Sequence, residues 1–201
     1  MDSTDVTPFD QTVDVGKFIP LSELTDKLWA LRGELLNAPQ GNAHCIPLHG
    51  RRNRTPREAW HAALFARAYE CYFQLQDMYV WIEPEQNSAH DAILRWSADS
   101  STHQLKVQLK ELPSEDLNPS LTLQDLIDEK VKSMAAVKDV AIAFLVGRNL
   151  PVMQVRIPDN DLAGVWIFGF TGDGKAEFIS LNGSDEKGEH CNIRPNSRTA
   201  I

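Results

Sequence analysis

The feature that most constrains the fold is a run from Gln104 to Lys110 in which polar and apolar residues alternate strictly. Successive side chains of a β-strand point to opposite faces, so this run predicts a strand with one apolar face and one wholly polar face. The segment Ala92–Trp96 predicts a second strand, and the polar residues 99–102 predict the turn between the two. The apolar face must be covered, whereas the polar face must meet either water or a functional site.

Further helices and strands are predicted on both sides of this pair. In chain order, periodicity and turn signals predict a helix at 22–36, a helix at 57–76, strands at 78–82, 92–96 and 104–110, a helix at 122–134, and strands at 140–146, 152–157, 165–170 and 176–181. The run at 140–146 is apolar throughout and follows a helix, which is typical of a central strand in parallel pairing with an earlier one. Residues 171–174 predict a hairpin turn. The expected fold class is therefore α/β with a mixed sheet.

One domain is expected, because 201 residues with 42% hydrophobic content suffice for a single substantial core. Residues 1–18 are acidic and poor in apolar anchors, which predicts a flexible arm before a domain at 19–182, and residues 183–201 predict a polar tail. No run approaches the roughly 18 consecutive apolar residues of a membrane span, and the start lacks the pattern of a signal peptide. We therefore expect no membrane partner and a cytoplasmic location.

The net charge of -8 argues against a protein that coats nucleic acid through a generally basic surface. Positive charge is nevertheless concentrated in one stretch, at Arg51, Arg52, Arg54 and Arg57. This stretch leads into a capping box, Thr55–Glu58, and the start of a helix attracts phosphate through its free N–H groups and its dipole. The four arginines are therefore candidate nucleic-acid contacts, and a solvated loop is the alternative.

Several enzyme classes have no support in the sequence. The three cysteines, Cys45, Cys71 and Cys191, are far apart and odd in number, which favours free thiols over a disulfide framework or a zinc cluster. We also find no glycine-rich phosphate loop, no HExxH helix and no GxSxG elbow.

The predicted order of helix, three strands, helix and strand from about 55 to 147 resembles the αβββαβ core of the PD-(D/E)XK nuclease superfamily, the restriction-endonuclease-like fold. In that family an aspartate at the start of one strand is followed by a (D/E/Q)-x-K motif on the next. Asp91 matches the aspartate, Gln108 and Lys110 match the motif, and Glu70 matches the glutamate that the preceding helix commonly supplies. The predicted C-terminal strands and N-terminal helix would be additions to this core.

The resemblance implies a metal-dependent nuclease that hydrolyses DNA, with RNA as an open alternative. Mg²⁺ or Mn²⁺ would be held by Asp91, Gln108 and Glu70, since Mg²⁺ takes oxygen ligands and needs few of them from the protein. The metal would lower the pKa of a bound water, and Lys110 would position that water or neutralise charge on the phosphate.

The sequence leaves three alternatives open. Gln104 and Lys106 repeat the motif two residues earlier on the same face, so they are a second possible register. Gln108 replaces an acid, so the chain could instead be a catalytically inactive binding or regulatory module with a protein partner or a second copy of itself. The polar strand face could also be solvated without any function. Among the histidines, His90 beside Asp91 is the one to test.

Overall fold

The computed structural model describes residues 15–37, 54–85, 88–113, 115–147, 155–170, 175–180 and 189–192. Side chains are described in these ranges except at 31–37, 54–56, 170, 175–180 and 189–192. The predicted arm before residue 15, Arg51 and Arg52, and most of the predicted tail lie outside the described residues.

The secondary-structure elements follow the predicted order closely. Within the described ranges they are β1 (Phe18–Pro20), α1 (Leu21–Asn37), α2 (Arg54–Tyr72), β2 (Tyr79–Ile82), β3 (Ala92–Ala98), β4 (Ser101–Leu112), α3 (Leu123–Met134), β5 (Val140–Val146), β6 (Gly164–Phe170), β7 (Lys175–Ser180) and β8 (Glu189–Asn192). No described helix is long and apolar enough to cross a membrane.

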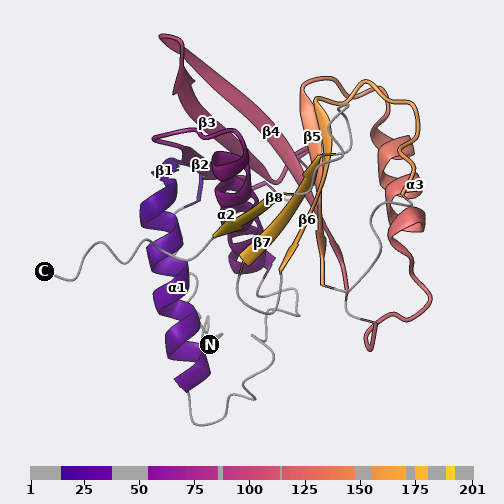
Figure 1. Cartoon of the computed structure of the whole chain (residues 1–201), viewed down its shortest axis with the longest axis horizontal. Coiled ribbons are helices and arrows are strands. Elements are labelled where there is room, and N and C mark those ends of the chain that lie inside the picture. Colours follow the sequence, from indigo (N-terminus) through magenta and orange to yellow (C-terminus); the bar gives the residue numbers. More distant parts are fainter. Residues whose placement is uncertain are drawn as a thin grey trace, which may run out of the picture.

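The strands form one mixed sheet in which the spatial order is the chain order, β1 to β8. Strands β1 to β4 are antiparallel, β4, β5 and β6 run parallel, and β6 to β8 are antiparallel again. In Figure 1, α3 stands beside β5 and β6, whereas α1 lies at the other end of the sheet beside β1 and β2. The mixed α/β class and the parallel pairing of β4 with β5 are as predicted.

Two hydrophobic clusters lie on opposite faces of the sheet. One packs α1 and α2 against β1 to β6, and the other packs α3 against the end of β4 and against β5 and β6. Strand β5 contributes to both: Ala141 and Ala143 belong to the first cluster, and Ile142 and Phe144 to the second. Every residue of β5 is buried, which confirms the predicted central strand.

Helix α3 also matches its prediction. Thr122 is its N-cap and forms a complete capping box with Asp125. The predicted inner stripe is buried in full, at Leu123, Leu126, Ile127, Val131 and Met134.

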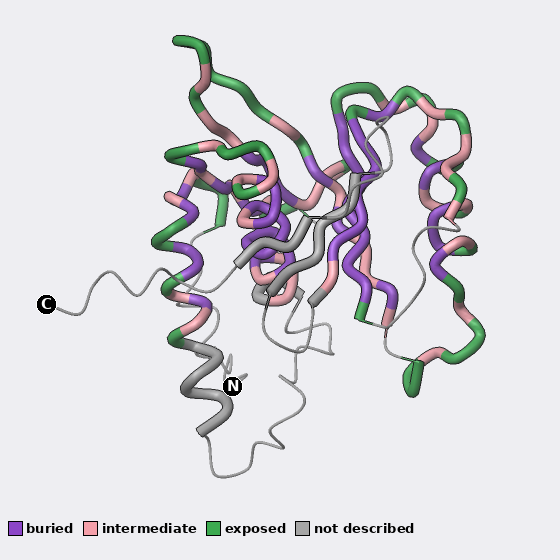
Figure 2. Tube along the Cα trace, viewed as in Figure 1, coloured by how far each residue is buried: buried purple, intermediate pink, exposed green. Residues whose placement is uncertain are grey.

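Strands β3 and β4 form a hairpin closed by Asp99 and Ser100. Both residues have positive φ, 49° and 63°, as a tight two-residue turn of the type that suits twisted strands requires. The hairpin tip is exposed and extends beyond the body of the molecule (Figure 2).

Strand β4 is longer than its partner β3, and this difference shapes the molecule. Pairing with β3 runs from Ser101 to Val107, where it ends opposite Ala92. Pairing with β5 continues from Lys106 to Leu112. Residues 108–112 therefore have a strand on one side alone among the described elements. We call the space beside them, beyond the start of β3, the β4 notch.

Other sequence predictions differ from the structure. Residues 155–157 of the strand predicted at 152–157 lie in no helix or strand. The backbone N–H and C=O of Arg156 each bond the side-chain amide of Gln124 at 2.9 Å, so Val155 and Ile157 pack beside α3 without a sheet ladder. Helix α2 begins at Arg54, not Arg57, which places the predicted cap Thr55 inside its first turn. The short strands β1 and β8 were not predicted, because three or four residues carry too little periodicity.

Candidate functional site

A cavity of about 550 Å³ opens in the β4 notch. Its lining comes from three places that are distant in the sequence: the first turns of α2, the residue before β3, and the end of β4 with the loop that follows. The lining residues are Arg57, Glu58, His61, Asp91, Leu109, Lys110, Glu111, Pro113 and Leu117.

Asp91 is fixed at the point where the β3–β4 ladder ends. Its backbone N–H donates to the carbonyl of Val107 at 2.8 Å, and its Oδ2 accepts the backbone N–H of Leu109 at 2.7 Å. The carboxylate thus takes the next place in the ladder, where a residue of β3 would otherwise stand. This arrangement holds the half-buried carboxylate against β4 with its second oxygen, Oδ1, outside that bond.

The end of β4 supplies a cation and a second carboxylate. Lys110 and Glu111 are half-buried neighbours, and both line the cavity because it follows the free edge of the strand. Glu111 Oε2 lies 3.9 Å from Nε2 of the buried His61. Counted by side chain, the lining holds three carboxylates, at Glu58, Asp91 and Glu111, against the cations Arg57 and Lys110.

Two of the predicted site residues, Asp91 and Lys110, line this cavity together with the predicted phosphate contact Arg57. Gln108 does not line it. Gln108 is half-buried and stands opposite Ile142 of β5. Gln104 and Lys106 are further from Asp91, because they pair with Arg95 and Ile93 along β3. Of the two registers, the one that ends in Lys110 is therefore the one beside Asp91.

Glu70 lies away from the cavity, towards the other end of α2. It follows Glu58 by twelve residues of helix, a rise of about 18 Å. Glu70 forms an ion pair with Arg67, and both side chains are 18% exposed. Burial raises the pKa of Glu70 above its ordinary value, and the charge of Arg67 opposes that shift. A part for Glu70 in a metal site stays a prediction from sequence.

The residues that sequence reasoning missed are Glu58, His61 and Glu111. Arg57 and His61 are four positions apart and so share a face of α2, a spacing that could have marked the start of this helix as a site. Glu111 adjoins Lys110 but falls on the other strand face, so the alternating pattern set it aside. The signal that would have found it is the free edge of β4, which a sequence pattern does not record.

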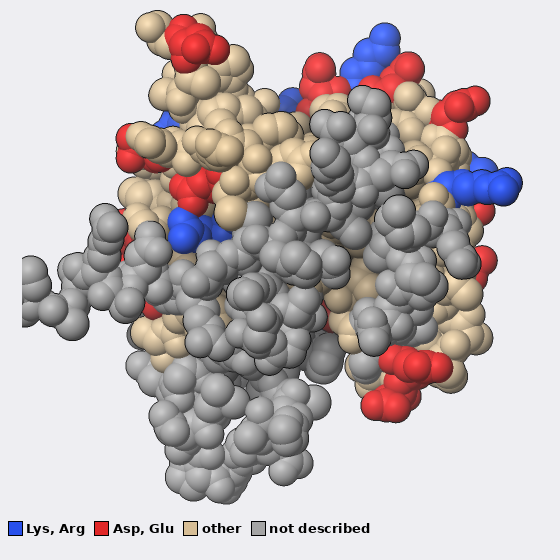
Figure 3. Space-filling model, viewed as in Figure 1, with Lys and Arg blue, Asp and Glu red and all other residues tan. Residues whose placement is uncertain are grey.

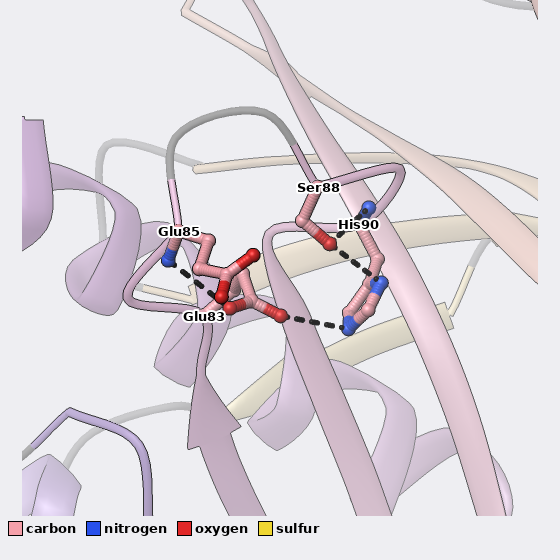
Figure 4. Close-up of polar contacts among 4 residues, drawn as sticks. All are labelled: Glu83, Glu85, Ser88 and His90. Carbon is pink, nitrogen blue, oxygen red and sulfur yellow. Dashed lines mark hydrogen bonds and ion pairs between the residues drawn. The ribbon is translucent and has the colours of Figure 1, made fainter.

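The β2–β3 connection carries Asp91 and contains a polar cluster (Figure 4). His90 lies between two partners: its Nδ1 is 3.0 Å from Ser88 Oγ, and its Nε2 is 3.2 Å from Glu83 Oε2. The backbone N–H of Glu83 also donates to the carbonyl of Asp91 at 3.0 Å. His90 thus contacts other residues of the β2–β3 connection and does not line the cavity. Its position favours a role in supporting the connection that carries Asp91.

The cavity lining offers carboxylates, the ligand type that a hard cation takes, but few of them. Among the described side chains, no group of three or more His, Cys, Asp and Glu residues could hold a metal ion by itself. Mg²⁺ usually keeps several waters and is bound through one or two carboxylates and the phosphates of its substrate. Asp91 and one further carboxylate of the lining would meet that requirement.

Charge elsewhere on the molecule is mixed. Figure 3 displays acidic and basic side chains interspersed over the described part of one face. Of the four predicted arginine contacts, Arg57 lines the cavity, Arg54 begins α2 with its side chain outside the described set, and Arg51 and Arg52 lie outside the described residues.

No protein-family model, curated protein or solved structure matches this chain.

Proposed function

We propose that this protein is a metal-dependent nuclease that hydrolyses phosphodiester bonds of DNA in the β4 notch. The observation that carries the proposal is the meeting of Asp91, Lys110 and a second carboxylate in one cavity at the start of a helix. The order α2, β2, β3, β4, α3, β5 agrees with the αβββαβ core of the PD-(D/E)XK superfamily and supports membership of it.

Each lining residue has a part that its chemistry allows. Asp91 and a second carboxylate, Glu111 or Glu58, would hold Mg²⁺ or Mn²⁺. A metal bound there supplies an activated water and stabilises charge on the phosphate. Lys110 adds a compact positive charge beside Asp91, which neutralises charge as it develops on the phosphate oxygens.

The start of α2 would hold the substrate. Its free N–H groups and the positive end of its dipole attract phosphate, and Arg57 offers a planar donor group in the same turn. The three carboxylates of the cavity would repel a phosphate that arrives without a cation. Substrate binding in the notch is therefore expected to depend on the divalent metal. Arg51, Arg52 and Arg54 stay phosphate contacts predicted from the sequence.

A second candidate function is a binding or regulatory module that has the nuclease fold and no activity. Two observations favour it: Gln108 stands in place of an acid, and no described group of three or more metal-binding side chains is present. Such a module would bind a protein partner or a second copy of the chain.

The test compares Asp91→Asn and Lys110→Ala with the unaltered protein on plasmid, single-stranded DNA and RNA, in Mg²⁺ and in Mn²⁺. Asn keeps an oxygen that can accept the Leu109 N–H, so folding should survive. Cleavage should fall by about a hundredfold or more in each variant, as when a charge-stabilising group is removed from an active site. Lys138→Ala, at an exposed lysine far from the notch in the chain, is the control. If neither metal supports cleavage by the unaltered protein, the second candidate is favoured.

A further inference from the structure

The sheet has a region that no described helix covers. Ile19, Val80 and Leu94 belong to the cluster beneath α1 and α2, so their strand neighbours point to the opposite face. The cluster beneath α3 on that opposite face includes no residue of β1, β2 or β3. Figure 1 agrees, since α3 stands beside β5 and β6 and away from β1 and β2. The outer side of β1 to β3, with the first part of β4, is therefore an open face.

Strand register arranges this open face in two rows. Residues directly opposite one another in antiparallel strands share a face. One row runs Phe18, Trp81, Ile93, Lys106, and the next runs Tyr79, Arg95, Gln104. Three aromatic rings on β1 and β2 thus lead across the sheet to an arginine, a lysine and a glutamine on β3 and β4.

The aromatic side of the open face contacts Arg95. The Arg95 guanidinium carbon lies 3.8 Å from the ring centroid of Phe18 and 5.1 Å from that of Tyr79. The rings of Phe18 and Trp81 are 6.0 Å apart. A guanidinium stacked on a ring keeps its N–H groups, which lie in the plane, available for an anion. Phe18, Tyr79, Trp81 and Arg95 are all half-buried, so part of each residue still meets solvent, although Nε1 of Trp81 is buried.

The charges of the open face are unusual in a chain of net charge -8. Within the described residues, neither Arg95 nor Lys106 has a carboxylate partner. The strand residues that point this way on β2, β3 and β4 include no acid between Tyr79 and Trp81, between Ile93 and Ser97, or between Thr102 and Lys110. Solvent-exposed strand faces usually mix both signs, whereas aromatic rings beside unpaired cations suit a polyanion that also carries flat bases.

We propose that the open face binds single-stranded nucleic acid, with bases stacked on its aromatic side, where the Arg95 guanidinium lies over Phe18 beside Tyr79 and Trp81, and with phosphates held by Arg95 and Lys106. Lys106 precedes Lys110 by four residues on the same strand face, about 13 Å along β4. A strand that lies on the open face thus continues toward the notch. The inference rests on the proposed function for its choice of nucleic acid as ligand, and it adds single strands as the substrate class.

Binding is measured by fluorescence polarisation of a labelled oligo-dT in EDTA, where no metal-dependent cleavage occurs. Lys106→Glu and Arg95→Gln should each weaken binding by about tenfold, as loss of a phosphate contact does. Lys132→Glu makes the same charge change at an exposed site on α3 and should leave binding unchanged. Lys106 is exposed, so its variant should keep the circular dichroism and melting temperature of the unaltered protein.

Two further probes isolate the parts of the proposal. An abasic oligonucleotide of equal length should bind at least about tenfold more weakly, because it keeps the phosphates and removes the stacking bases. A duplex should compete less well than the single strand. Equal binding by Lys106→Glu, Lys132→Glu and the unaltered protein would overturn the proposal, as would equal affinity for abasic and normal strands. So would sedimentation that reveals a dimer broken by Lys106→Glu, because the face would then join two copies. Because the readout is binding without metal, an inactive notch leaves this result intact.

Discussion

The two ends of helix α2 each present an acid to a half-buried setting, with opposite results. Glu58, near the start, lines the cavity with Asp91 and Lys110. Glu70, near the end, is held by Arg67 and has a raised pKa because it is buried. Both acids belong to one helix that is apolar over much of its surface. The two acids differ in the part of the sheet beside them. The start of α2 meets the end of β4, where β4 has no β3 partner.

A helix does not make a site merely by carrying an acid. The cavity exists because β4 continues beyond the start of β3. Of the two acids of α2, Glu58 lines the cavity because it lies at the level of the sheet where β4 has lost its β3 partner. At the other end, α2 is followed by a turn in which Gln74 and Asp77 have positive φ, 53° and 52°. Asp77 further raises the pKa of Glu70 there.

The largest expected effect is on the stability of the fold, at Phe65, which lies between the two ends of α2. This side chain is fully buried in the middle of α2, and its ring lies 5.5 Å from Phe168 and 5.8 Å from Tyr69 by centroid. Phe65→Ala should lower the free energy of unfolding by about 3–5 kcal/mol, since it removes a ring from a packed core. Phe73→Ala is the control, because Phe73 is 43% exposed. Equal urea midpoints for the two variants would show that α2 is not anchored through Phe65.

The second effect separates the two acids in activity. Glu58→Gln should reduce metal-dependent cleavage by about tenfold or more, because it removes a carboxylate from the cavity. Glu70→Gln should change cleavage by less than about twofold under the same conditions, because Glu70 lies about 18 Å along the helix from Glu58. Initial rates at saturating metal would measure both. The reverse order of effects would restore Glu70 as the site residue that the sequence suggested.

The smallest effect concerns stability and pH at Glu70. Its pKa is raised in the folded protein, so the folded state keeps the proton to a higher pH than the unfolded state does. Protonation of Glu70 therefore stabilises the folded state fully at pH values below the pKa of Glu70 in the unfolded chain. This stabilisation is lost as pH rises through the pKa of Glu70 in the folded protein. Glu70→Gln lacks this dependence. The unfolding free energy of Glu70→Gln, measured relative to that of the unaltered protein, should therefore increase from about pH 4 to about pH 7.

Urea unfolding at both pH values measures that change, with Glu129→Gln as the control at an exposed position on α3. A difference between Glu70→Gln and the unaltered protein that stays constant with pH, or that moves the other way, would contradict the raised pKa.

Much of the fold could be predicted because its signals are local. The capping box at Thr122, the buried stripe of α3 and the apolar run of β5 each lie within one short segment. The prediction at 152–157 failed over 155–157 because alternation records which residues are buried, not whether a strand or a helix side chain satisfies the backbone.

The site was less predictable, because it depends on where two strands stop. Asp91 and Lys110 could be found from a strand start and an alternating run, and they do line one cavity. Glu111 and His61 could not, since they meet across the gap between β4 and α2, whose level is set by tertiary packing. Glu70 drew attention as an acid within an apolar helix, and the structure pairs it with Arg67.

The hydrogen bond from the Leu109 N–H to Asp91 Oδ2 has a consequence for solubility. A strand edge with unpaired backbone donors is a template on which another chain can add a strand. Among the described strands, β4 leaves such an edge beyond Val107, and Asp91 occupies its first donor with a charged group. A change that removes the acceptor would expose an adhesive edge at the mouth of the cavity. The carboxylate of Asp91 therefore blocks the first position at which a second chain could pair with this edge.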